Sequence, residues 1–247
     1  MNIAWSGLAD DNYWGHIAQY CVPSWTALPG DKFIVHDAQT VQIPDITVIP
    51  WDIVVNDDSN FPKQCLKTKP HGFWRKMQSQ VWAVRNLTDY DWLVLLDTDV
   101  EIVDFDQIEF ERILEEFKDS NLIWATGESQ KRKLDAGHII FNMRHPDLYK
   151  LIDTYENIWE SGDIFKLERY YDGHAVQSLF DRYPSYKIKN TDHGGGLHTY
   201  KIGTVHYGSK IPKALRAVWS GDTKQLVAEM IVDKETMADN FNIQGKR

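Results

Sequence analysis

The spacing of apolar residues alternates along this chain between two patterns, one typical of strands and one typical of helices. Runs that are apolar at every position are typical of buried strands, and the clearest covers residues 92–96. Apolar residues three and four apart predict amphipathic helices, as over residues 73–87, where Trp74, Met77, Val81 and Val84 share one face. Other predicted strands are 3–5, 32–36, 46–49, 122–125 and 137–141, and other predicted helices are about 13–28, 110–117, 148–159, 174–182 and 223–231. This alternation predicts an α/β fold with a mostly parallel central sheet flanked by helices.

Breaks between these elements predict the turns and loops. A turn is predicted at Ser6-Gly7, and a kink in the first helix at Pro23. Three consecutive glycines predict a loop over residues 192–198. A chain of 247 residues can bury a substantial core, and we predict one domain over residues 1–247.

Composition narrows the function classes. A net charge of −9 opposes broad affinity for nucleic acid or for an anionic membrane. The opening residues lack a charged leader and no run can span a bilayer, which predicts a soluble, cytoplasmic protein without a transmembrane segment. Cys21 and Cys65 lack the spacing of a zinc or redox motif. Ten tryptophans favour a carbohydrate ligand, because sugars bind against flat aromatic faces.

Asp97-Thr98-Asp99 directly follows the apolar strand at residues 92–96. Open α/β sheets bind ligands beyond the carboxyl ends of such strands. Residues two apart in extended chain point to the same side, so both carboxylates can hold one hard cation that also binds phosphate oxygens. A surface turn after a strand explains the Asp-x-Asp triplet alone equally well.

Ala9-Asp10-Asp11-Asn12-Tyr13 follows the first predicted strand. Together with the Asp-x-Asp triplet, this segment resembles the retaining, GT-A-fold glycosyltransferases of the glycogenin and bacterial lipopolysaccharide galactosyltransferase type. The resemblance covers four islands between residues 9 and 210. It implies a GT-A (Rossmann-like) sheet with a nucleotide-binding half over about 1–100, an acceptor and sugar half over about 101–220, and a C-terminal helical tail over 221–247.

The resemblance also implies a nucleotide and metal site. The uridine pocket would be lined by Asp10, Asn12 and Tyr13, although an Asp or Asn there is equally typical of a helix cap. The metal, Mn²⁺ or Mg²⁺, would be held by Asp97, Asp99 and His206. Thr98 would contribute to the nucleotide site, and a diphosphate contact would come from Lys210, for which Lys213 is an alternative because His206-Tyr207-Gly208-Ser209-Lys210 is shorter than the family motif.

Sugar contacts and catalytic residues are implied by two further islands. Asp135-Ala136-Gly137 corresponds to a family turn that holds the sugar, and Asp172 to a carboxylate beside the reacting carbon. Asp172 and Asp135 are therefore the catalytic candidates. The chain departs from the family at Gly173 and His174, which stand where the family has Gln and Asp. Arg75 or Lys76 would place a cation against the diphosphate, unless both lie on a solvated helix face.

These residues together predict metal-dependent transfer of a hexose from a UDP-sugar to the hydroxyl of a saccharide or other acceptor, with retention. A hydrolase is disfavoured because His193-Gly194-Gly195-Gly196 comes without any Gly-x-Ser-x-Gly nucleophile motif. Zinc bound by His193, His198 and His206 lacks a known ligand spacing. A metal-dependent nucleotidyltransferase of similar fold and a non-catalytic carbohydrate-binding protein remain the alternatives.

Overall fold

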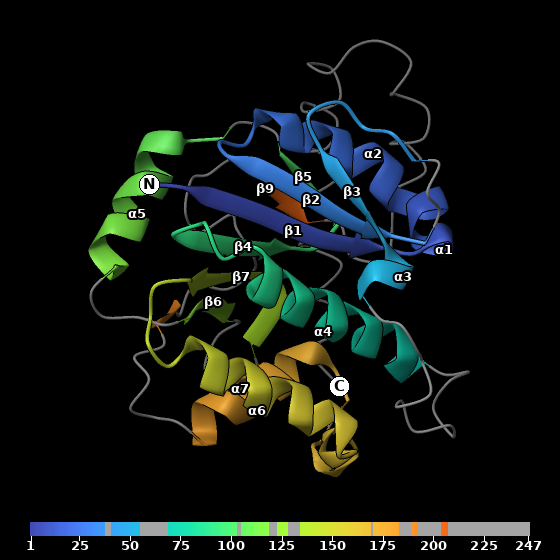
Figure 1. Ribbon diagram of the computed structural model, residues 1–247, viewed down its shortest axis with the longest axis vertical. Coiled ribbons are helices and arrows are strands. Elements are labelled where there is room, and N and C mark those ends of the chain that lie inside the picture. Colours follow the sequence, from blue (N-terminus) through green and yellow to red (C-terminus); the bar gives the residue numbers. More distant parts are fainter. Residues whose placement is uncertain are drawn as a thin grey trace, which may run out of the picture. The chain divides into compact units, whose positions relative to one another are not determined.

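A mixed, mostly parallel sheet organises the chain (Figure 1). The computed structural model describes residues 1–37, 41–54, 69–102, 105–118, 123–127, 134–168, 170–182, 189–191 and 204–206. Within them the sheet has seven strands in the order β3-β2-β1-β4-β7-β6-β8, and only β7 runs antiparallel to its neighbours. The strands are β1 (Ile3–Ala9), β2 (Asp31–His36), β3 (Thr47–Pro50), β4 (Trp92–Leu96), β6 (Ile123–Gly127), β7 (Leu134–Asn142) and β8 (Lys189–Thr191). The predicted α/β class is confirmed.

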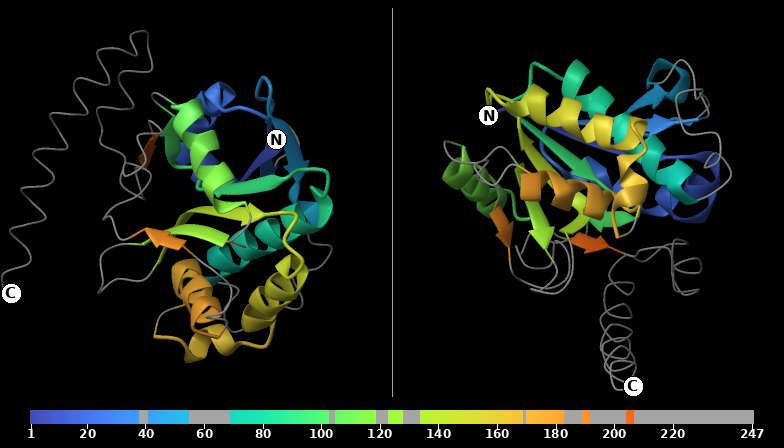
Figure 2. Two further views of the ribbon diagram at one scale, coloured as in Figure 1. Left: turned by 90° about the vertical axis from the view of Figure 1, so that its left-hand side faces the viewer. Right: turned by 90° about the horizontal axis from the view of Figure 1, so that it is seen from below.

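Two hydrophobic clusters cover the two faces of β4. Leu93 and Leu95 belong to the cluster with α4 (Lys69–Asn86), α6 (Leu148–Glu160) and α7 (Asp172–Arg182). Trp92, Val94 and Leu96 belong to the other cluster, which includes residues of α5 (Gln107–Phe117). Figures 1 and 2 show α4, α6 and α7 gathered on one side of the sheet. Burial on both faces explains why β4 is apolar at every position.

The helices follow the predicted periodicity, with shifted ends. Helix α4 starts four residues before the predicted 73, and Trp74, Met77, Val81 and Val84 are all buried. The predicted helix over 13–28 is a continuous helical stretch of α1 (Asp11–Tyr13), a π-helical turn (Trp14–Ala18), α2 (Gln19–Cys21) and a 3₁₀ segment (Val22–Ala27). The change to 3₁₀ geometry coincides with Pro23, which lacks a backbone donor. The predicted helix over 223–231 and the loop over 192–198 lie outside the described residues.

Two predicted turns are wrong. Ser6 and Gly7 lie inside β1, which continues to Ala9. The segment at 135–137, which the resemblance implies is a turn, lies in β7. Gly7 is required by close packing: a Cβ there would lie 2.7 Å from the Leu96 carbonyl oxygen and 2.9 Å from Thr98 Cγ2. This glycine allows β4 and the Asp-x-Asp segment to approach β1.

Gly7→Ala is expected to lower the free energy of unfolding by about 1–3 kcal/mol, because the added methyl overpacks a site closed by backbone on one side. Chemical denaturation measures the change. Gly72→Ala is the matched control, since a Cβ at Gly72 meets no atom within 4 Å and Gly72 lies inside α4. Equal stabilities for the two variants would contradict the packing argument.

Residues 1–206 form one compact unit, and strands from both predicted halves share its main sheet. The assignment of a nucleotide half, a sugar half and a helical tail stays a prediction. Across the described part of the chain, no helix has the length and apolar character needed to cross a membrane.

Candidate functional site

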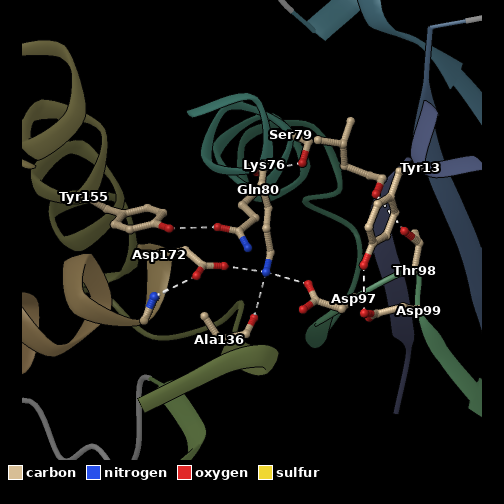
Figure 3. Close-up of polar contacts among 12 residues, drawn as sticks. Tyr13, Lys76, Ser79, Gln80, Asp97, Thr98, Asp99, Ala136, Tyr155 and Asp172 are labelled. Carbon is tan, nitrogen blue, oxygen red and sulfur yellow. Dashed lines mark hydrogen bonds and ion pairs between the residues drawn. The ribbon is translucent and has the colours of Figure 1, made fainter. Parts of the chain in front are cut away.

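Acidic residues gather where three parallel strands end at the same edge of the sheet. Asp10 follows β1, Asp37 follows β2, and Asp97 follows β4. Ligands of open α/β sheets bind beyond this edge. Figure 3 shows the part of this edge around Asp97 and Asp99.

Lys76 joins three segments that are far apart in the sequence. Its ammonium nitrogen lies 2.5 Å from Asp97 Oδ1 and 2.5 Å from Asp172 Oδ2, and it donates to the Ala136 carbonyl over 3.2 Å (Figure 3). Burial alone would lower the pKa of Lys76, but the negative charges of Asp172 and Asp97 outweigh it and raise the pKa. Lys76 is therefore a fixed positive charge in the site, not part of a solvated helix face.

Asp172 is held through both of its carboxylate oxygens. It is the first residue of α7, and its Oδ1 accepts a hydrogen bond of 2.9 Å from the Gly173 N–H. The other oxygen contacts Lys76. The helix N-terminus also favours a negative charge at this position. Asp172 is therefore a charged and well-positioned carboxylate.

Tyr13 links the segment after β1 to Asp99. Its hydroxyl donates to Asp99 Oδ2 over 2.7 Å (Figure 3). Its backbone N–H donates to Asp10 Oδ1 over 2.7 Å. Burial, and then the charge of Asp99, raise the pKa of Tyr13, so the phenol stays a neutral donor. Asp10 is thus the N-cap of α1, as the cap interpretation predicted. A carboxylate can accept further hydrogen bonds, so its uridine contact stays a prediction.

Thr98 ties the Asp-x-Asp segment to β1. Its side chain is buried, and its hydroxyl donates to the Leu8 carbonyl over 2.9 Å. This contact fixes the backbone between the two aspartates. The side chain of Asn12 lies outside the described part of the structure, and the nucleotide roles of Asn12 and Thr98 stay predictions.

Arg75 is engaged by a different partner from Lys76. Its guanidinium donates from Nη1 to Asp37 Oδ2 over 3.1 Å, pairs through Nη2 with Asp37 Oδ1, and lies 4.2 Å from the ring centre of Trp51. Partial burial would raise the pKa of Asp37, but its hydrogen bonds and ion pair with Arg75 lower it. Of the two predicted cations, Lys76 is thus the one in contact with the Asp-x-Asp segment.

The backbone brings the predicted metal residues into one region. Strands β5 (Val100–Ile102) and β9 (Thr204–His206) pair antiparallel, with His206 opposite Val100, the residue after Asp99. The described side chains contain no group of three His, Cys, Asp or Glu residues arranged for a metal, and the His206 side chain is not among them. Two carboxylates and an imidazole form a donor set that suits Mn²⁺. The metal site therefore stays a prediction, as do the roles of Lys210 and Lys213, which lie outside the described residues.

The predicted sugar segment lies against the same centre. The Ala136 carbonyl accepts from Lys76, and the Gly137 carbonyl accepts from the Asp97 N–H over 2.8 Å. Asp135 lies in β7 with its backbone opposite Thr126, and its side chain is outside the described part. Contacts therefore connect the predicted residues of β7, α4 and α7 with Asp97, which follows β4.

Two buried polar residues behind Lys76 were not predicted. The Tyr155 hydroxyl donates to Gln80 Oε1 over 3.0 Å (Figure 3). A pocket of about 20 Å³, large enough for one water molecule, is lined by Gln80, Lys76, Asp97 and neighbouring residues. The position of Gln80 four residues after Lys76 is the sequence signal, because residues four apart share a helix face. Tyr155 is a buried residue of α6, and helical spacing of apolar residues accounts for its ring but not for its hydroxyl.

Comparisons with known proteins identify the fold. No protein-family model matches the sequence, and no curated protein is significantly similar to it. Mouse xyloside xylosyltransferase 1 is similar in structure, with a TM-score of 0.52 and 9% identity over 85% of this chain and 99% of that one. A glycosyltransferase involved in glycosylation of the major capsid of PBCV-1 has a TM-score of 0.53 and 10% identity, over 85% and 95% of the two chains. The bifunctional glycosyltransferase WbbM has a TM-score of 0.50 and 13% identity, over 85% of this chain and 46% of its own. The chain therefore has the GT-A glycosyltransferase fold, as predicted.

Proposed function

We propose that this protein is a glycosyltransferase that moves a hexose from a UDP-sugar to an acceptor hydroxyl, with Mn²⁺ or Mg²⁺ and with retention of configuration. The observation that carries the proposal is the Asp97–Lys76–Asp172 contact at the carboxyl edge of a GT-A sheet. One cation there joins the carboxylate expected near the diphosphate to the carboxylate expected near the sugar. The fold's hydrophobic core lies on the two faces of β4, and none of these three charged residues belongs to it.

The donor would lie across this edge. Asp10, Asn12 and Tyr13 would bind uridine, and Asp97, Asp99 and His206 would hold the metal. The bound metal would supply positive charge that offsets the charge developing on the departing UDP. Lys76 and Lys210 would add fixed positive charges beside the diphosphate, which stabilise a leaving group without reorganisation.

Asp172 would position the donor sugar. Its two oxygens already accept from Lys76 and from the Gly173 N–H, and these contacts disperse the charge that a nucleophile needs. The geometry therefore favours same-face transfer, in which the β-phosphate takes the proton of the acceptor hydroxyl. Asp135 is the second carboxylate candidate beside the sugar.

A panel of nucleotide sugars tests the function. Purified protein is expected to release UDP from at least one UDP-hexose when Mn²⁺ is present, and the first-formed product is expected to keep the anomeric configuration by NMR. Pyrophosphate release from a nucleoside triphosphate and a sugar phosphate would instead identify a nucleotidyltransferase. Sugar binding without any turnover would identify a carbohydrate-binding protein. An inverted product would contradict same-face transfer, and a sugar found on Asp172 by mass spectrometry would support double displacement.

A further inference from the structure

Four aromatic rings meet at the start of α7. The ring of Tyr171 lies 5.2 Å from that of Phe73, 5.5 Å from that of Tyr170 and 6.2 Å from that of His174, measured between ring centres. Phe73 and Tyr170 also pack against the hydrophobic core. Tyr171 itself is 36% exposed. An exposed ring is thus held in place by three neighbouring rings.

Tyr171 is held by its backbone as well as by the contacts of its ring. Its carbonyl accepts the first hydrogen bonds of α7, from the His174 N–H over 3.0 Å and the Ala175 N–H over 3.1 Å. A tyrosine side chain has few rotatable bonds, so little conformational entropy is lost when a ligand covers it. The site is therefore preorganised before a ligand arrives.

The aromatic cluster adjoins the Lys76–Asp172 ion pair. Phe73 and Lys76 are three residues apart on α4, so their side chains are neighbours on one helix face. Tyr171 and Asp172 are consecutive residues. The contact between α4 and α7 therefore has two adjacent parts, the aromatic pair Phe73–Tyr171 and the ion pair Lys76–Asp172.

The direction of α4 places the aromatic pair farther out. Helix α4 leads into β4, and Lys76 reaches Asp97 at the carboxyl end of that strand, so α4 runs from the carboxyl edge toward the amino edge of the sheet. Phe73 precedes Lys76 by about one helical turn and therefore lies farther beyond the carboxyl edge. The Tyr171 ring contacts Phe73, so it would lie on the outer side of a donor bound at Asp97 and Asp172.

We propose that Tyr171 is the stacking platform of an acceptor subsite, and that the acceptor is a saccharide. The apolar C–H face of a pyranose ring fits an exposed aromatic face, and its hydroxyls can bond to neighbouring polar groups. The platform borders the carboxylate expected to hold the donor sugar, so it is where an acceptor hydroxyl would approach the reacting carbon. The inference rests on the proposed function for its place in the reaction, but the binding of saccharides by Tyr171 can be tested alone.

Saturation-transfer difference NMR tests that binding with the methyl β-glycosides of glucose, galactose and xylose as probes. The wild-type protein and Tyr171→Phe, which keeps the ring, are expected to bind at least one glycoside. Tyr171→Ala is expected to bind it about tenfold more weakly, because the stacked ring is lost. Tyr149→Ala is the matched control, since Tyr149 on α6 is 48% exposed and belongs to no site described above. Thermal unfolding of each variant verifies that the fold is intact.

Kinetics separate this inference from the proposed function. With a UDP-sugar that is turned over, Tyr171→Ala is expected to raise the KM for the glycoside about tenfold and to leave the KM for the donor near the wild-type value. The platform would be overturned if Tyr171→Ala turned over the donor and bound the glycoside as tightly as the wild-type protein. It would also be overturned if the wild-type protein bound none of the glycosides. Tyr171-dependent glycoside binding without turnover of any nucleotide sugar would uphold the platform and refute the proposed function.

Discussion

Replacement of Lys76 by methionine is expected to lower kcat/KM for the UDP-sugar by about 10²–10³-fold, the loss typical when one preorganised charged or hydrogen-bonding group is removed from a transition-state site. In the native protein the Lys76 ammonium lies 2.5 Å from an oxygen of Asp97 and 2.5 Å from an oxygen of Asp172. Methionine is an unbranched side chain one atom shorter than lysine, and it removes the charge. Steady-state kinetics on the donor that is turned over measure the loss.

The same change is expected to destabilise the fold. Removing one partner of a buried ion pair leaves uncompensated charge and costs about 3–5 kcal/mol, and the Lys76 side chain is only 20% exposed. Mutual repulsion would then raise the pKa of one of the two aspartates. A carboxyl whose folded pKa is raised holds more protons in the folded state, so the free energy of unfolding of the variant should fall as the pH rises through that pKa.

Two further variants separate stability from chemistry. Lys76→Arg keeps the charge and is expected to retain much of the activity. The double variant Lys76→Met/Asp172→Asn removes the repulsion, so it should recover stability without recovering turnover. Wild-type turnover in Lys76→Met would show that the contact between the two carboxylates is not part of the active site.

The sequence was most informative where burial alone decides the structure. Residues 92–96 are apolar throughout, and β4 has these bounds because both of its faces are covered. The four predicted core residues of α4 are buried for the same reason. Periodicity reports which side of an element meets the core, and these elements contain no competing local preference.

The sequence was least informative where a local preference competes with packing. Ser6-Gly7 is typical of a turn, yet Gly7 lies in β1 because its missing side chain makes room for Leu96 and Thr98. The resemblance also implied a turn at 135–137, but this segment is part of β7, whose backbone pairs with β4 and β6. Long-range packing of this kind cannot be read from neighbouring residues.

Pairings between side chains were the least predictable part of the candidate site. The resemblance to glycosyltransferases indicated Asp97, Asp172 and a cation at Arg75 or Lys76, but it did not indicate which cation pairs with which carboxylate. The structure pairs Arg75 with Asp37 and Lys76 with Asp97 and Asp172. Arg75 and Lys76 are adjacent on α4, so their side chains point about 100° apart and meet different carboxylates. Which of them faces Asp97 depends on how α4 is rotated about its axis, and the sequence does not give that rotation.

Asp97→Asn and Asp99→Asn are each expected to lower turnover by about 10³-fold or more and to remove the effect of Mn²⁺ on UDP binding. Each change removes one of the charges proposed to hold the metal, while amide oxygen remains as a hydrogen-bond acceptor for Lys76 or for Tyr13. The fold is therefore expected to survive. Calorimetric titration with UDP, in Mn²⁺ and in EDTA, measures the effect.

Asp89→Asn is the matched control for these two variants, because Asp89 is exposed on the turn before β4 and loses the same charge away from the site. It should bind UDP like the wild-type protein, more tightly in Mn²⁺ than in EDTA. Thermal unfolding should show one cooperative transition for each of the four proteins, well above the assay temperature, which would assign the losses to the site. Full wild-type activity in EDTA would refute a metal at Asp97 and Asp99. Mn²⁺-dependent tightening that survives in both variants would place the metal on other residues of the chain.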